Sequence, residues 1–208
     1  MKKSWMVGLS LLGLLSILAM LSSDAAEREK ALTQANVQFA FNAGSSAQTK
    51  YAAYAEGAEK EGYKSVAALF RALSRAKAIQ TAKYASLLHD YGVDAKPAAV
   101  PAELKSTGEN LEAAIKTENT GATVIYPEFV KQAQQDKNAR AAIIFRRTAI
   151  TTKEQVRLCR TALKDLADWK SPDKTFLVCP GCGYISMDKA IKKCNVCAAS
   201  GDIFEKIR

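Results

Sequence analysis

Hydrophobic residues recur every three or four positions along most of the chain between residues 26 and 169. This spacing is typical of amphipathic helices, and it predicts four long helices over about 28–61, 65–91, 107–136 and 138–169. Gly62 is expected to end the first helix, and Ser65 is the expected N-cap of the second. The third helix starts with Ser106-Thr-Gly-Glu109, which has the form of a capping box. The pattern therefore predicts an all-α four-helix bundle with one long crossover connection before the third helix.

An internal repeat supports this architecture. Residues of the first two predicted helices recur 75 positions later in the last two, where Tyr51, Ala58, Ala67, Phe70 and Arg71 match Tyr126, Ala133, Ala142, Phe145 and Arg146. Each set covers the end of one helix, a turn and the start of the next. We expect two helical hairpins related by a pseudo-two-fold axis.

The first 25 residues have the composition of an export signal. Lys2 and Lys3 precede an apolar run over residues 6–21, and Ser23 and Ala25 suit the small positions before a cleavage site. The run is short for a membrane span. We therefore expect a signal peptide over residues 1–25 and an exported, periplasmic mature protein with no integral membrane domain. An uncleaved N-terminal segment that tethers the protein to the membrane is the alternative.

Two Cys-x-x-Cys pairs near the C-terminus carry the clearest chemistry. Cys179 and Cys182 are followed, after eleven residues, by Cys194 and Cys197. Knuckles of this kind place four thiolates around one metal ion, and both zinc and a single iron accept such a tetrahedral sulfur site. Two disulfides are the alternative in an exported protein, although closing such short loops constrains little unfolded chain. The pattern predicts a four-cysteine metal ribbon over residues 174–208, following a helical domain over residues 26–170.

Residues between and beside the cysteines agree with a metal site. Gly181 and Gly183 allow backbone N–H groups to turn toward the sulfur atoms, which disperses thiolate charge. The second knuckle is less regular, because Ala198 stands where a glycine would ease the backbone.

The chain is basic, with a formal net charge of +9, or +8 without residues 1–25. An exported protein seldom meets nucleic acid, and the cationic residues are spread along the helices without interleaved aromatic residues. Nucleic acid is therefore not an expected partner. The charge is explained by solubility alone or by affinity for an acidic redox partner.

These features resemble the rubrerythrin family. The resemblance covers the mature chain and is most specific at Cys179-Pro-Gly-Cys182-Gly-Tyr184, with weaker matches at Ala40-Phe41, at residues 59–63 and at Tyr126-Pro127. It implies a ferritin-like four-helix bundle joined to a rubredoxin-like module. It also implies a homodimer in which a di-iron centre, held by glutamates and two Glu-x-x-His motifs, reduces peroxide with electrons from the rubredoxin-like iron.

The family's di-iron ligands are mostly missing from this chain. The positions that match them carry Gly44, Lys77, Gln80, Glu118, Gly121, Thr152 and Gln155, and Glu154 lies near one of them. The chain has one histidine, His89, and no Glu-x-x-His. Because two irons need several oxygen donors facing inward, we expect a degenerate site and no peroxidase activity.

Four other residue types have simple interpretations. Lys77 is expected to extend its ammonium group to solvent, and a buried ion pair with Glu118 is the alternative. His89 is interpreted as a helix-end residue, and Cys159 as a half-buried small hydrophobe, with a redox role or an intermolecular disulfide as its alternative. The tyrosines are expected to be packing residues.

The expected function is one-electron transfer or oxidative-stress redox chemistry by one iron held by four cysteine thiolates, with an unidentified partner protein. A zinc-containing structural or interaction protein is the first alternative, and a peroxide-reducing di-iron enzyme is the second.

Overall fold

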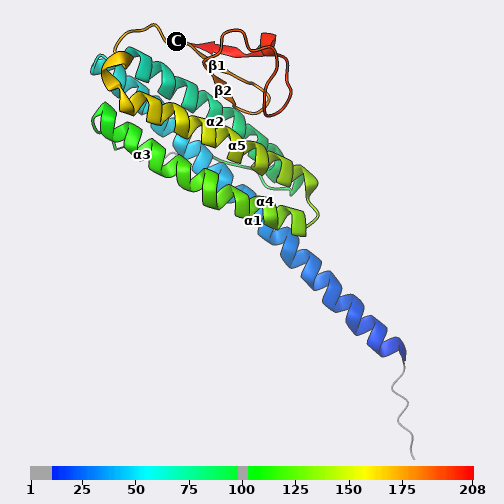
Figure 1. The fold of residues 1–208 in the computed structure, drawn as a ribbon. Coiled ribbons are helices and arrows are strands. Elements are labelled where there is room, and N and C mark those ends of the chain that lie inside the picture. Colours follow the sequence, from blue (N-terminus) through cyan, green and yellow to red (C-terminus); the bar gives the residue numbers. More distant parts are fainter. Residues whose placement is uncertain (1–10, 98–102) are drawn as a thin grey trace, which may run out of the picture.

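The computed structural model describes residues 11–97 and 103–208, with side chains from residue 31 onward (Figure 1). The predicted signal peptide falls partly outside this range, because residues 1–10 are not described. Residues 11–25 form the start of a long first helix, which extends past the ends of the other helices in Figure 1. In the described part of the chain, no helix combines the length and apolar character needed to cross a membrane.

The helical domain is a four-helix bundle, as predicted. Its elements are α1 (Leu11–Lys60), α2 (Lys64–Asp90), α3 (Thr107–Thr120), the π-helix η1 (Gly121–Ile125), α4 (Tyr126–Gln135), α5 (Ala139–Lys164) and the 3₁₀-helix η2 (Leu166–Trp169). The third predicted helix therefore corresponds to three consecutive segments, α3, η1 and α4, with the π-helix in the middle. The fourth is shorter than predicted, because the α-helix ends at Lys164.

Local sequence explains most of the helix ends. Gly62 follows α1 with a φ of +83°, a left-handed conformation that glycine adopts without steric cost. Ser106 caps α3, and its hydroxyl and Glu109 form the predicted capping box. The prediction for Ser65 is wrong, because Tyr63 occupies the N-cap position of α2. The Ser65 hydroxyl instead donates to the backbone carbonyl of Ser171 in the linker.

The predicted repeat corresponds to two similar aromatic clusters at opposite ends of the bundle. Tyr54 packs edge-on against Phe70 with ring centroids 5.3 Å apart. Phe129 and Phe145, each 75 positions later, lie 5.2 Å apart. The first pair belongs to an apolar core centred on α1 and α2, and the second belongs to a core to which α1, α2, α4 and α5 all contribute. Both hairpins therefore bury the same pattern of residues.

The C-terminal module is a small antiparallel sheet with strand order β2-β1-β3. Its strands are β1 (Phe176–Val178), β2 (Ile185–Ser186) and β3 (Glu205–Ile207), and the 3₁₀-helix η3 (Gly201–Ile203) precedes β3. Leu177 of β1 packs against a small separate cluster around Cys179, Cys182, Cys194 and Phe204, whereas the other apolar side chains of the sheet reach the bundle. Phe176, Val178 and Ile185 are fully buried within the core cluster of α1 and α2.

Contacts with α2 fix the position of the module. Gly183, with a φ of +76°, lies so close to α2 that a Cβ atom there would come within 2.8 Å of the Ala76 carbonyl oxygen. Arg75 forms a bidentate ion pair with Glu205, at 2.5 and 2.6 Å. The first cysteine knuckle therefore rests against the middle of α2.

Candidate metal centre

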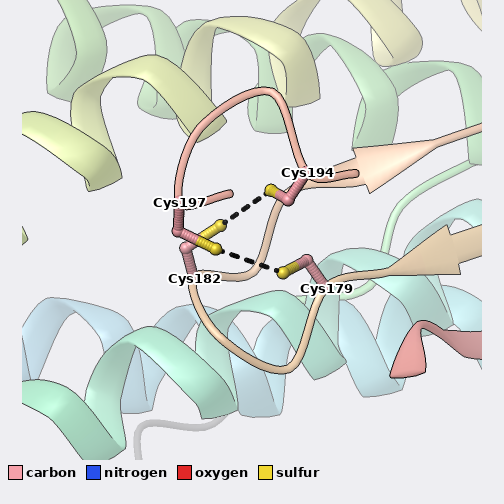
Figure 2. Close-up of side chains that lie close together, drawn as sticks. All are labelled: Cys179, Cys182, Cys194 and Cys197. Atoms are coloured by element: carbon pink, nitrogen blue, oxygen red, sulfur yellow. Dashed lines mark hydrogen bonds between the residues drawn. The ribbon is translucent and has the colours of Figure 1, made fainter. Parts of the chain in front are cut away.

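The four cysteines meet at one point between the two knuckles (Figure 2). Their sulfur atoms all lie within 4.8 Å of one another, with Cys179 and Cys197 at 3.5 Å and Cys182 and Cys194 at 3.6 Å. All four are free cysteines. A tetrahedral site with metal–sulfur bonds of about 2.3 Å has sulfur–sulfur edges of about 3.8 Å, so the arrangement fits one metal ion.

Two of the four thiols in this cluster resist ionisation in the absence of a cation. Burial raises the pKa of Cys179 to about 12 and raises that of Cys182 as well. Burial also opposes ionisation of Cys197, but the Ala199 N–H and the neighbouring thiols donate to its sulfur and lower its pKa. A bound cation would supply the charge that allows all four to ionise, so metal binding must release protons.

Backbone geometry prepares the knuckles for negative charge. The N–H groups of Gly181, Tyr184 and Ala199 donate to the sulfurs of Cys179, Cys182 and Cys197 respectively. This agrees with the prediction that the glycines of the first knuckle let backbone N–H groups turn toward the sulfur atoms. Ala198 has a φ of +63°, so an alanine adopts the left-handed conformation that the sequence had suggested for glycine.

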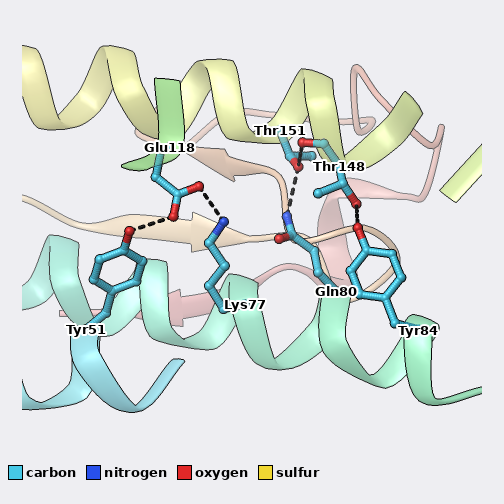
Figure 3. Close-up of polar contacts among 7 residues, drawn as sticks. All are labelled: Tyr51, Lys77, Gln80, Tyr84, Glu118, Thr148 and Thr151. Atoms are coloured by element: carbon cyan, nitrogen blue, oxygen red, sulfur yellow. Dashed lines mark hydrogen bonds and ion pairs between the residues drawn. The ribbon is translucent and has the colours of Figure 1, made fainter. Parts of the chain in front are cut away.

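A second polar centre lies inside the bundle, and it includes Lys77, Gln80 and Glu118, which the resemblance had matched to metal-ligand positions (Figure 3). The Lys77 ammonium group is 2.5 Å from a carboxylate oxygen of Glu118, and the side chains are only 4% and 5% exposed. The prediction that Lys77 reaches solvent is wrong, and the alternative ion pair is confirmed. Lys77 lies 13 residues into α2, roughly 20 Å from its start, and Glu118 supplies a nearer partner for the ammonium group.

Tyr51 completes this centre by donating its hydroxyl to the other oxygen of Glu118, at 2.5 Å. Burial, followed by the nearby carboxylate, raises the pKa of Tyr51 well above its usual value. The expectation that Tyr51 only packs is therefore incomplete. Its recurrence as Tyr126 indicated a structural role but gave no sign of a hydrogen bond.

Two further polar pairs extend this centre along the bundle. The Gln80 amide donates to Thr151 at 2.9 Å, and the Tyr84 hydroxyl donates to Thr148 at 2.7 Å. All four side chains are buried. Sequence reasoning identified Gln80 as a substituted ligand position but did not find its partner, because the spacing of two threonines on a distant helix carries no signal.

The remaining candidate residues are not part of either centre, although Cys159 lies near enough to Glu118 for the carboxylate to add to the effect of burial on the pKa of its thiol. His89 is exposed in the last turn of α2, as expected for a helix-end residue. Cys159 is fully buried rather than half-buried, because it faces the core shared by α1 and α2, and burial raises its pKa. Glu154 pairs with Arg157 at 2.6 Å. Among the side chains that the structure describes, in residues 31–97 and 103–208, the four cysteines are the one group of three or more potential ligands close enough to hold a metal.

Comparison with known proteins agrees with this architecture. The family model described as Rubrerythrin matches residues 35–155. Rubrerythrin-1 of Clostridium acetobutylicum is 32% identical over 181 residues, covering 83% of this chain and 93% of the relative. Nigerythrin of Nitratidesulfovibrio vulgaris is 30% identical over 173 residues, covering 83% of this chain and 85% of the relative.

Solved structures show the same similarity. Nigerythrin in a mixed-valence state superposes with a TM-score of 0.79 at 28% identity, covering 84% of this chain and 86% of the other. A fully reduced, all-ferrous state of nigerythrin gives a TM-score of 0.78 at the same identity. The family model covers more than half of the chain, and two relatives that are 30% and 32% identical each cover 83% of it. The chain therefore belongs to the rubrerythrin family.

Proposed function

We propose that this protein is an exported member of the family that holds one iron through Cys179, Cys182, Cys194 and Cys197 and transfers single electrons. The observation that carries this proposal is the approach of the four sulfur atoms, all within 4.8 Å of one another. An iron bound there would supply a one-electron couple. Zinc fits the same four sulfurs, and a zinc-containing structural role is therefore the alternative.

The residues around the cluster suit outer-sphere electron transfer. Cys197 is partly exposed whereas the other three cysteines are buried, so one edge of the cluster is close to solvent. The exposed Lys192 and Lys193 precede Cys194 and would attract an acidic partner protein. Iron is favoured over zinc because the similar nigerythrin structure is described as all ferrous.

The bundle residues do not fit a di-iron centre. Lys77 places a positive charge where the family has a ligand, and that charge is already neutralised by Glu118 at 2.5 Å. A cation entering this site would be repelled by the ammonium group and would find a single carboxylate. We therefore propose that the family's di-iron site is degenerate in this protein and that it does not reduce peroxide at that site.

Export and dimerisation complete the proposal. Residues 1–25 supply the features of a cleaved leader, so the mature chain would begin at Ala26 in the periplasm. Mass spectrometry of the protein recovered from a periplasmic extract tests this directly. A membrane-bound chain of full length would instead support the tethered alternative. The homodimer implied by the family is tested by analytical ultracentrifugation.

Metal analysis tests the main proposal. The full sequence is expressed in a host grown with iron and with limiting zinc, and the purified protein is examined by elemental analysis and visible spectroscopy. We expect one iron per chain and a ferric-thiolate spectrum that bleaches reversibly on reduction. One zinc without colour, under conditions where iron was in excess, would reject the electron carrier. Two further irons would reject the degenerate bundle site.

A further inference from the structure

A pocket of about 270 Å³ lies between the first knuckle and the bundle. Gly181 and Cys182 form its wall on the side of the module, and α2 and α5 form the opposite wall. Its volume is just below the roughly 300 Å³ at which small-molecule sites begin. The pocket therefore has room for a small ligand beside the metal centre.

Three cationic side chains line this pocket, Lys83 from α2 with Arg140 and Arg147 from α5, and none of the lining residues is acidic. Arg140 is engaged by Asp90 and Ser86. Within the described residues, neither Lys83 nor Arg147 forms an ion pair. Two cations that form no ion pair therefore line the pocket, and the nearest anionic group is the metal-bound thiolate cluster, of which Cys182 is part of the pocket wall.

The other walls of the pocket add fixed polar and apolar surface. Gln80 and Thr148 are 3% and 2% exposed, and their hydrogen bonds to Thr151 and Tyr84 hold them in place (Figure 3). Ile143 and Ile144 line the same pocket, and Ile143 is 47% exposed. Cations beside an apolar surface suit an anionic group attached to a small organic body.

We propose that this pocket binds a phosphate group, supplied either by inorganic phosphate or by a small phosphate ester. Arginine and lysine are the usual phosphate ligands in proteins, and Arg147 offers a planar fork for bidentate contact. The assignment depends on the protein's own side chains and holds for either metal in the cysteine cluster.

The position of the pocket couples it to the metal centre. A Cβ atom on Gly181 would lie 3.0 Å from the Cys197 sulfur and 3.6 Å from that of Cys179, so little more than this residue separates the pocket from the sulfurs. If the proposed electron carrier is correct, reduction adds a negative charge next to the bound phosphate. Phosphate should then bind more tightly to the oxidised protein and lower the reduction potential.

Calorimetric titration of the metal-loaded protein at constant ionic strength tests the site, with inorganic phosphate and phenyl phosphate as probes. We expect saturable binding of one phosphate per chain. Tighter binding of phenyl phosphate would identify an ester as the preferred source, and equal binding would identify free phosphate. Absence of saturable binding by both probes would overturn the proposal.

Substitutions on α5 provide a matched control. Arg147→Gln should weaken phosphate binding at least tenfold, because a hydrogen-bonded charge is lost. Arg146→Gln removes the same charge from the adjacent, exposed position outside this pocket and should change affinity less than twofold. Equal weakening by both would indicate general attraction and overturn the site. Lys83→Gln, an exposed substitution on α2, provides a second test if Arg147→Gln does not fold.

A redox titration tests whether phosphate binding changes the reduction potential of the metal centre, independently of whether phosphate binds. In the iron form, a tenfold difference in phosphate affinity between oxidation states corresponds to a potential shift of about 59 mV. An unchanged potential with saturable binding would reject the coupling. A zinc-containing protein that still binds phosphate would reject the electron carrier and support the site.

Discussion

The cysteine cluster and the Lys77–Glu118 pair both gather ionisable groups away from water, and they differ in the source of the compensating charge. The four thiols can ionise together only when a cation arrives from outside, since burial raises the pKa values of Cys179 and Cys182. The bundle holds its own cation, because the Lys77 ammonium group contacts Glu118 at 2.5 Å. One centre is thus built to exchange an ion with its surroundings, whereas the cation of the other is a side chain of the protein itself.

Of the substitutions that test the difference between these two centres, loss of one cysteine ligand should have the largest effect. Cys194→Ser should remove metal from the purified protein, since structural zinc in small domains contributes roughly 10–16 kcal/mol and depends on every ligand. Elemental analysis measures the loss. Cys159→Ala removes a buried thiol that is not in the cluster and should leave the metal content unchanged. Equal metal loss in both variants would contradict the assignment of the four ligands.

Breaking the buried ion pair should have the next largest effect. Lys77→Met leaves the Glu118 carboxylate buried without its cation, and we expect a loss of about 3–5 kcal/mol in the free energy of unfolding. Urea denaturation measures it. The triple variant Lys77→Met, Glu118→Leu, Tyr51→Phe removes all three polar partners and should recover most of the loss. A cost below about 1 kcal/mol for Lys77→Met would place the ammonium group in water and contradict the structure.

The seating of the module against α2 can be tested at Gly183. An alanine there would be strained by the φ of +76° and would press its Cβ against the Ala76 carbonyl. Gly62→Ala meets the same kind of strain, with a φ of +83°, but no atom lies within 4 Å of its Cβ. Gly183→Ala should therefore cost roughly 1–3 kcal/mol more than Gly62→Ala in thermal or urea unfolding. Equal costs would mean that the module does not rest on α2.

The second knuckle should gain stability from a glycine. Ala198→Gly relieves the left-handed backbone and should stabilise the metal-loaded protein by about 1 kcal/mol. Ala199→Gly, at the next position, has no such conformation to relieve and should be neutral or destabilising. A rise in melting temperature for Ala198→Gly alone would confirm the strain, whereas a fall in both would exclude it.

The smallest effect is expected at the surface ion pair between Arg75 and Glu205. Hydrogen bonds from Arg75 lower the pKa of Glu205, so the ionised carboxylate stabilises the folded state at neutral pH and this contribution is lost as the pH falls. Arg75→Gln should cost less than about 1 kcal/mol at pH 7, because the pair is partly exposed. The difference from the unaltered protein should shrink on acidification, and a difference that grows would contradict this sign.

Sequence periodicity and motif spacing were sufficient for the architecture and for the cluster of four cysteines. The spacing of Cys179, Cys182, Cys194 and Cys197 determines a cluster almost without reference to the rest of the chain. The capping box at Ser106 and the turn at Gly62 are equally local, and both were predicted correctly.

Features that depend on distant partners could not be predicted in this way. The direction of the Lys77 side chain depends on Glu118, which lies 41 positions away. Helical periodicity places Lys77 on the core-facing side of α2, but it does not distinguish a side chain that reaches solvent from one that forms a buried ion pair. The Ser65 hydroxyl bonds to Ser171 across 106 positions, so its role as an N-cap could not be excluded from the α2 sequence alone. The contact of Gly183 with Ala76 likewise requires the packed structure.

Phe176, Val178 and Ile185 belong to the same apolar core as α1 and α2. The metal-binding ribbon and the helices should therefore unfold in a single cooperative transition. An ion that binds only the folded ribbon then raises the melting temperature of the helices as well, by mass action. A metal held by the four sulfurs would thus stabilise helices that contribute none of its ligands.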